Sequence, residues 1–505
     1  MATLVVERDE ADVRDRNTRT ARQILLQAAL LGLLADNVFR NAAEGLGWTV
    51  WIGGLVVATV LVVQDRRGRF SREQLAWLTV VVACAAAVAW RDAELLLVAN
   101  VVATLAALAL FAMSHAGLPA SSILSARVRD ALAACVYAAR DALSGAFPLL
   151  FREAELGSAI QASAAARRPA LRAVLLTAPL VILFTALLSR ADPVFGALFR
   201  LPSVNIEEIA SHVLLGGIFA WLSAGWMRGS LLPTTRATLP EHVPWRLGIV
   251  DITTSLGALA GLFAVFVGMQ LRWLFGGAEV VEATTGLTLA EYARRGFFEL
   301  VLVAALVFPL ILGTRAAITD DVTIRRHRRL SLALLVLLGA IMASAVVRMR
   351  LYVMQFGLST DRLFALVFMT WLVLVFGALA LTVLRGWSRP FAAMTVLSGF
   401  ATLFALNAFN PEAIVARVNL GRSAAPRAVD YAYLSRLSGD AMPAVAPALA
   451  AAEPSTASCA SARTLRKRWL STDGTRSNLG SWRGREAVRT HLTPSRVRRL
   501  CAAMP

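Results

Sequence analysis

The chain has 505 residues, of which 57% are hydrophobic and only 17% are charged, and its mean hydropathy is +0.62. Soluble proteins carry about 25% charged residues, so this composition excludes an ordinary soluble protein. The net charge of +18 does not indicate nucleic-acid binding, because the arginines flank apolar blocks long enough to cross a bilayer. We expect an all-α, polytopic helical transmembrane bundle whose partner is the lipid bilayer, with no nucleic acid.

The N-terminal part is predicted to be a cytoplasmic basic arm, residues 1–22, followed by a four-span region, residues 23–113. No small-residue cleavage site follows the first apolar block, so we interpret this block as an anchor and not as a cleaved signal peptide. The four spans are expected at 23–40, 46–63, 75–90 and 94–113.

Residues 114–170 are predicted to form a cytoplasmic amphipathic segment. The stretch 130–151 is moderately apolar but contains Arg140 and Asp141, which are costly in hydrocarbon. We interpret it as a helix lying at the membrane interface. The alternative is that it spans the membrane, which would invert the orientation of everything after it.

Residues 171–409 are predicted to be a seven-span core, which brings the total to about eleven spans. The core spans are expected at 171–189, 211–227, 250–273, 296–314, 330–347, 363–384 and 391–409. Alternate loops are rich in Arg, as at 65–73 and 325–329, whereas the intervening loops, such as 205–208, are richer in acids. The positive-inside rule then predicts a cytoplasmic N-terminus and, with an odd number of spans, an extracytoplasmic C-terminus.

The composition changes after the last span. Asn410 as N-cap, Pro411 and Glu412 predict a short periplasmic helical segment within 410–444. Residues 445–505 are rich in Ala, Pro and Ser and then in Arg, and we expect a low-complexity, poorly ordered basic C-terminal tail. Its two cysteines, at 459 and 501, could pair if the tail faces an oxidising compartment, but nothing in the sequence requires it.

Two stretches place charged residues on the predicted outer side. "TLAEYARRGFFEL" (288–300) begins with a predicted capping box, and the acid of this box, an Arg and a second acid then fall four residues apart on one helix face. "RMRLYVMQFGLSTDRLF" (348–364) has arginines where the positive-inside rule expects few. We hypothesise that acids on adjoining helices neutralise these arginines in an outer polar cluster; the alternative is simple interfacial anchoring. The predicted cluster consists of Glu291, Arg295, Glu299, Arg348, Tyr352, Asp361 and Arg362.

Motifs for known chemistry are missing from the sequence. It has no phosphate-cradling G-x-x-x-x-G-K-[ST], no H-E-x-x-H and no G-x-S-x-G, and its five histidines are dispersed. We therefore expect no catalytic, cofactor-binding or metal residues and no cofactor.

Five blocks resemble a known family: "DPVF" (192–195), "LTLAEYARRGFFEL" (287–300), "RMRLYVMQFGLSTDRL" (348–363), "NPEAIVARVN" (410–419) and "DYAYLSRLSGDAMPA" (430–444). Together, over roughly residues 170–444, they are similar to a bacterial polytopic membrane protein family known only as a domain of unknown function, number forty-one seventy-three. The resemblance implies a multi-pass protein of the bacterial cytoplasmic membrane and brings no established activity, substrate or cofactor.

Three functional hypotheses follow. The first is a non-enzymatic membrane protein that binds an anionic small molecule or a lipid headgroup at the outer cluster, for transport or sensing. The second is a membrane-embedded enzyme acting on lipid-linked or envelope substrates, with Glu299 or Asp361 as acid or base. The third is a scaffold for partner proteins that uses residues 410–444 for docking. The sequence leaves the substrate and the oligomeric state open.

Overall fold

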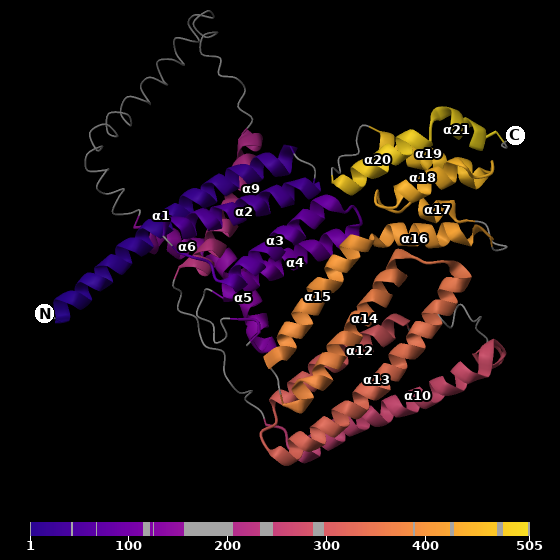
Figure 1. Cartoon of the computed structure of the whole chain (residues 1–505), viewed down its shortest axis with the longest axis horizontal. Coiled ribbons are helices and arrows are strands. Elements are labelled where there is room, and N and C mark those ends of the chain that lie inside the picture. The colour runs from indigo at the N-terminus through magenta and orange to yellow at the C-terminus, as the bar shows by residue number, and fades with distance from the viewer. Residues whose placement is uncertain are drawn as a thin grey trace, which may run out of the picture.

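The computed structural model describes most of the chain as helices joined by short links (Figure 1). The described residues are 2–41, 44–66, 68–114, 122–124, 126–155, 206–232, 246–285, 297–386, 389–424, 429–471 and 478–502. No strand occurs among them, which confirms the all-α fold.

Nine helices in the described ranges are long and apolar enough to cross a membrane. They lie in α2 (Glu44–Asp65), α3 (Arg72–Trp90), α4 (Glu94–Met113), α9 (Ile206–Leu231), α10 (Ile249–Thr285), α12 (Phe297–Ala316), α13 (Asp321–Phe356), α14 (Thr360–Leu381) and α15 (Arg389–Phe409). Large apolar side chains such as Val57, Val98 and Leu262 are more than half exposed on these helices, as lipid-facing residues are. The chain is therefore a multi-pass membrane protein.

Two of the eleven predicted spans are not among these nine. The span expected at 171–189 lies outside the described residues. The span expected at 23–40 lies in α1 (Ala2–Asn41), a single helix that also contains most of the predicted basic arm. Polar residues such as Arg22 and Asp36 keep α1 less apolar than the nine candidates.

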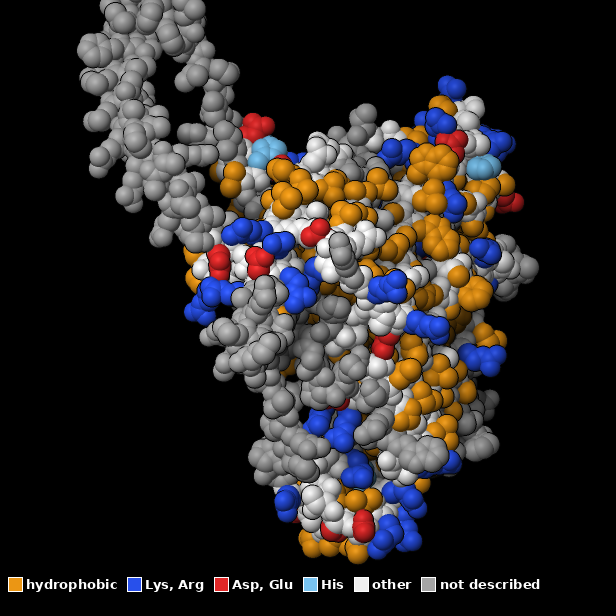
Figure 2. Space-filling model, turned by 60° about the vertical axis from the view of Figure 1, so that its left-hand side comes forward, with side chains coloured by type: hydrophobic (Ala, Val, Ile, Leu, Met, Phe, Trp, Pro, Cys, Tyr) orange, Lys and Arg blue, Asp and Glu red, His pale blue; other side chains and the backbone are white. Residues whose placement is uncertain are grey.

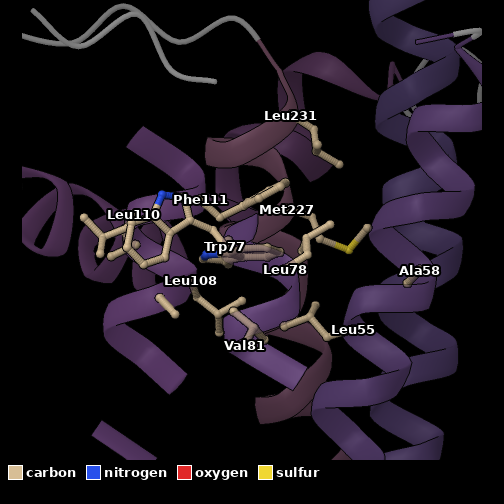
Figure 3. Close-up of a cluster of buried hydrophobic side chains, with 14 of the residues drawn as sticks. Leu55, Ala58, Trp77, Leu78, Val81, Leu108, Leu110, Phe111, Met227 and Leu231 are labelled. Carbon is tan, nitrogen blue, oxygen red and sulfur yellow. The ribbon is translucent and has the colours of Figure 1, made fainter. Parts of the chain in front are cut away.

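The first group of helices packs α1, α2, α3, α4 and α9 around one buried core. Figure 3 shows part of this core, where Trp77 and Leu78 of α3 meet Phe111 of α4 and Met227 of α9. α1 and α9 are antiparallel, because Asp36 near the end of α1 contacts His212 near the start of α9.

A second group, α10, α12, α13 and α14, surrounds a separate core that includes Leu256, Ile311 and Leu338. α15 lies between the groups. Its Phe391 belongs to the second core, whereas the next residue, Ala392, belongs to the first. The two groups thus have their own interiors and share one helix.

The amphipathic stretch at 130–151 does not form one of the nine candidate spans. It forms α5 (Val128–Ser144), α6 (Ala146–Pro148) and the start of a short π-helix, η1 (Leu149–Glu153). α5 packs against α9, where a Cβ at Gly225 would lie 2.3 Å from the Asp141 carbonyl oxygen. Only glycine at that position lets the two helices approach so closely.

The described residues within 411–502 form a compact helical domain, called here the outer domain because the positive-inside rule predicts the C-terminus on the outer side. It consists of α16 (Pro411–Leu420), η3 (Gly421–Ala424), α17 (Tyr431–Leu434), α18 (Met442–Ala450), α19 (Thr456–Leu470), α20 (Leu479–His491) and α21 (Pro494–Leu500). Its core contains Val415, Val445, Leu465 and Val488, so the segments predicted separately as 410–444 and 445–505 share one interior.

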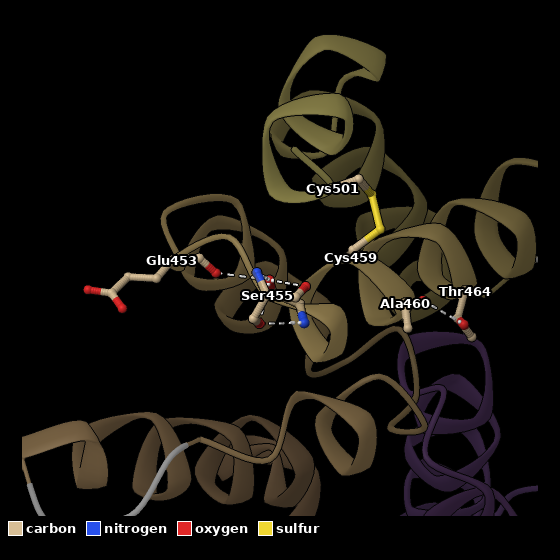
Figure 4. The surroundings of a disulfide bond; sticks show 7 residues. Glu453, Ser455, Cys459, Ala460, Thr464 and Cys501 are labelled. Carbon is tan, nitrogen blue, oxygen red and sulfur yellow. Dashed lines mark hydrogen bonds between the residues drawn. A yellow bond between two sulfur atoms is a disulfide. The ribbon is translucent and has the colours of Figure 1, made fainter. Parts of the chain in front are cut away.

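The expectation of a poorly ordered tail after residue 445 was wrong. Ser455 caps α19, whose buried face consists mostly of small residues that composition alone reads as low complexity. Cys459 and Cys501 form a disulfide that ties α19 to the end of α21 (Figure 4). The small side chains of α19 pack together with larger apolar residues such as Leu449, Leu465 and Val488, and the disulfide adds a covalent link.

The two ends of the helices differ in what covers them. The ends that meet the outer domain, called here the capped end, are the α3–α4 link (91–93), the α13–α14 link (357–359) and the end of α15 (407–410). The opposite end of the second group contains the α12–α13 link and the end of α14 and is rich in Arg. Figure 2 shows basic side chains at the lower tip of the molecule, where Figure 1 places this arginine-rich end, and others across its middle and upper parts.

Candidate functional site

A reciprocal pair of carboxylates joins the α3–α4 link to the outer domain. Asp440 Oδ2 accepts hydrogen bonds from the backbone N–H groups of Asp92, at 2.6 Å, and Ala93, at 3.1 Å. In return, Asp92 Oδ2 accepts one from the backbone N–H of Gly439, at 2.7 Å. The two acids are only 2% and 6% exposed. We call Asp92, Asp440 and these backbone groups the carboxylate clamp.

Arg91 links the clamp to the end of α15. Its Nε donates to the carbonyl oxygen of Asn407 at 2.7 Å, its Nη1 lies 3.5 Å from Asp440 Oδ1, and its guanidinium stacks 4.2 Å from the Trp90 ring centroid. The carbonyl groups in the last turn of a helix have no partner within the helix, and a cation favours the negative end of the helix dipole. The buried Arg91 therefore both caps α15 and offsets part of the negative charge of the clamp.

Further polar residues complete the contact. Asn478 at the N-cap of α20 donates to Asp92 Oδ1 at 3.1 Å, and Glu412 of α16 accepts from the Ser438 backbone N–H at 2.6 Å. A Cβ at Gly480 would lie 2.7 Å from Asp440 Oδ1 and 2.9 Å from the Asp92 backbone nitrogen, so glycine is required for this close approach.

Burial dominates the titration of two of these acids. It raises the pKa of Asp440 above its ordinary value, although the backbone N–H groups and Arg91 act in the opposite direction. It likewise raises the pKa of Glu412, with the hydrogen bond from Ser438 opposing. Desolvation of a carboxylate favours its neutral form. Burying the charged form of these two acids therefore costs free energy, which their hydrogen bonds offset in part.

The α13–α14 link is held by a second set of contacts. Asn419 of α16 both accepts from the backbone N–H of Leu358, at 2.9 Å, and donates to its carbonyl, at 2.7 Å. Tyr433 accepts from the Thr360 N–H at 3.0 Å, and Arg422 donates to the Met354 carbonyl at 2.7 Å. Leu358 itself belongs to the core of the outer domain. The outer domain therefore binds one hairpin tip of each helix group.

The sequence matches the family described as Domain of unknown function (DUF4153) over residues 77–448, well over half of the chain. The chain belongs to this family. The resemblance to a polytopic family of unknown function is thus confirmed, although the number is not forty-one seventy-three and the match begins before residue 170. No curated protein and no solved structure matches the chain.

The DUF4153 region contains the clamp, Arg91, Glu412 and the Asn419 and Tyr433 contacts, whereas Asn478 and the disulfide lie beyond it. Within the described ranges, no group of three or more His, Cys, Asp and Glu is arranged to hold a metal ion. Because each clamp carboxylate already accepts backbone or amide hydrogen bonds, the arrangement is suited to joining segments.

The predicted outer cluster is only partly described. Glu291 and Arg295 lie outside the described residues. Glu299 is exposed in the first turn of α12, Asp361 is exposed in the first turn of α14, and Arg348 is half-buried on α13.

Two members of the cluster do meet at the capped end. The Arg362 guanidinium lies 4.1 Å from the Tyr352 ring centroid, and it donates to the carbonyl of Gly357. Among the described residues Arg362 has no ion pair with a carboxylate. An aromatic ring and a backbone carbonyl hold it, where the sequence analysis expected an acid.

The sequence analysis did not predict the clamp, although both of its acids lie in short polar stretches that can be recognised in the sequence. The loop "RDAE" (91–94) lies between two predicted spans, and "SGD" (438–440) lies within the family block at 430–444. An Arg-Asp pair between two apolar spans is itself a signal, since a charged pair at a span boundary is costly without partners.

Proposed function

We propose that the protein is a non-enzymatic scaffold of the bacterial cytoplasmic membrane, with its N-terminus in the cytoplasm and the outer domain on the extracytoplasmic side. One observation carries the proposal: the outer domain forms buried hydrogen bonds to a hairpin tip of each helix group, through Asp440 to one and Asn419 to the other. A domain anchored at both points presents a surface of fixed orientation above the membrane, as a docking platform requires.

The charge distribution and the disulfide support this orientation. Arginines at the ends away from the outer domain follow the positive-inside rule, with the basic run at 325–329 as the strongest example. The Cys459–Cys501 disulfide belongs in an oxidising compartment such as the periplasm. The bond lies in the outer domain, which favours the periplasmic side.

The chain's own cysteines provide the test of orientation. Cys135 is exposed on α5, at the end of the first group away from the outer domain, and Cys84 is buried. In a Cys84→Ser background, a membrane-impermeant maleimide applied to spheroplasts should label Cys459 and Cys501 only after reduction. Cys135 should react only after the membrane is opened. Labelling of Cys135 from outside would invert the topology and refute the proposal.

The scaffold role predicts that partner proteins contact an exposed apolar patch on α20. There Leu479 is 39% and Trp482 is 61% exposed. A photoreactive amino acid at position 482 should crosslink defined membrane or periplasmic proteins in cells. The matched control is the same amino acid at the exposed position 490, at the other end of α20. Equal crosslinking from both positions, or none from position 482, would contradict a docking role for this surface.

A second candidate function is recognition of an anionic small molecule or lipid headgroup at the outer cluster. It is favoured because Arg362 is half-buried and has no carboxylate partner among the described residues. Thermal stabilisation by a panel of anions should then be lost in Arg362→Gln. It should be kept in Arg350→Gln, which alters an exposed Arg on α13. Catalysis is less well supported, because Glu299 and Asp361 are exposed and lack the burial that tunes an acid or base.

A further inference from the structure

A cavity of about 100 Å³ opens at the arginine-rich end, opposite the outer domain. Four arginines line it: Arg315, Arg325, Arg328 and Arg385. They come from three separate places in the sequence, namely the last turn of α12, the first turns of α13 and the 3-10 helix η2 (Val383–Arg385) that follows α14. Helix geometry places Arg325 and Arg328, three residues apart, on one face.

The turn after α14 shapes one side of the cavity. Gly386, which lines the cavity next to Arg385, has φ +92°, a left-handed conformation that a residue with a side chain rarely adopts. Ile324, Val383 and Leu384 give the cavity an apolar side. The cavity thus has a cationic rim and an apolar side at the end of membrane-crossing helices.

The described residues offset the charge of the four guanidinium groups only in part, since Asp320 lies close enough to Arg325 for the two charges to attract each other. Within the described ranges none of them donates a hydrogen bond or forms an ion pair with a carboxylate. The Asp320 carboxylate, at the N-cap of α13, accepts a hydrogen bond from the Thr323 backbone N–H at 2.8 Å and attracts Arg325 only through space, without an ion pair. The fully buried His327, which also lines the cavity, is held by Thr314 Oγ1 at 2.9 Å from its Nε2.

Arginines that only orient a helix project separately into water and need not converge on one cavity. Here four cations from distant segments surround one space, and their mutual repulsion is relieved when an anion enters. Guanidinium groups match phosphate oxygens through paired, charge-assisted hydrogen bonds. The apolar wall adds a surface that suits the glycerol and upper acyl carbons of a phospholipid.

We propose that this cavity is a binding site for a phosphate group, presented by the headgroup of an anionic phospholipid or by a soluble phosphate ester. The inference does not depend on the proposed scaffold role, because it rests on the opposite end of the molecule. It concerns a site distinct from the carboxylate clamp and from the predicted outer cluster.

The test is binding of defined phosphates to the purified full-length protein in detergent. Native mass spectrometry counts bound phosphatidylglycerol, with phosphatidylcholine as the zwitterionic comparison, and glycerol 1-phosphate serves as the soluble probe. Replacing two of the four arginines, Arg325→Gln with Arg328→Gln, should weaken binding by about tenfold or more, because charge-assisted hydrogen bonds are lost.

The chain offers a matched control on the same helix. Arg326→Gln with Arg329→Gln removes the same charge from exposed residues that do not line the cavity, and binding should change less than about twofold. If the Arg325→Gln, Arg328→Gln variant loses only phosphatidylglycerol binding, the site takes a lipid. If it loses only glycerol 1-phosphate binding, the ligand is soluble.

Equal loss in both double variants, or no loss in either, would overturn the proposal. Thermal unfolding of each variant monitors folding. If the first pair fails to fold, Arg385→Gln alone repeats the test from a different segment of the cavity wall.

Discussion

Removing the Asp440 carboxylate tests the clamp most directly. Asp440→Ala leaves two buried backbone N–H groups, those of Asp92 and Ala93, without their acceptor. Each unsatisfied buried donor costs about 1–3 kcal/mol. The loss of a desolvated charge, seen in the raised pKa of Asp440, offsets part of this cost. We expect docking of the outer domain onto the α3–α4 link to weaken by about 2–4 kcal/mol.

Hydrogen–deuterium exchange of a peptide covering the α3–α4 link measures this change. A loss of about 2–4 kcal/mol corresponds to roughly 30- to 1,000-fold faster exchange at the Asp92 amide. Asp440→Asn keeps one acceptor oxygen and should cost less than half as much. The control is Asp430→Asn at the N-cap of α17, where Asn caps as well as Asp. If Asp440→Ala exchanges no faster than this control, the clamp does not hold the domain.

Three other outcomes follow from the outer domain. Burial raises the pKa of Glu412, so the folded state holds its proton more tightly than the unfolded chain. The contribution of Glu412 to stability is then greatest at acidic pH and falls as pH rises through the raised pKa. In Glu412→Gln, the thermal unfolding midpoint should fall less steeply as pH rises over this range. An unchanged slope would show that other groups cause the pH dependence. Reducing the Cys459–Cys501 disulfide, which joins residues 42 positions apart, should cost about 4 kcal/mol in denaturant titrations with and without reductant. No shift in midpoint would show that packing alone holds α19 and α21 together. Gly480→Ala should destabilise by about 1–3 kcal/mol because its Cβ meets a clamp oxygen at 2.7 Å. Gly257→Ala, whose Cβ meets nothing within 4 Å, should not, and equal thermal shifts for the two would be inconsistent with close packing at Gly480.

The membrane-spanning helices could be predicted because their signal is local. Apolar blocks such as 94–113 coincide with α4, and the stretch 130–151, predicted to be helical, contains most of α5. Helix length and hydropathy are set by the thickness of the bilayer, so each block can be identified without knowing its neighbours.

The capped end could not be predicted in the same way, because its contacts are not local. The family blocks at 410–419 and 430–444 were identified as distinctive, and they do supply Asn419, Tyr433 and Asp440. Sequence reasoning looked for acids to pair with arginines, yet these residues bind backbone groups of links far away in the chain. Which backbone N–H lacks a partner is known only after the helices are placed.

The separation of the clamp partners along the chain has a consequence for biogenesis. Asp92 and the backbone N–H of Gly439 are 347 positions apart, and Asn478 is 386 positions from Asp92. Because synthesis runs from the N-terminus, the earliest hairpin enters the bilayer long before the ribosome has made the residues that satisfy its tip. The hydrogen bonds between the α3–α4 link and the outer domain therefore form among the final steps of maturation. A nascent chain stalled before residue 438 would present an unsatisfied Arg-Asp tip to membrane quality-control proteases.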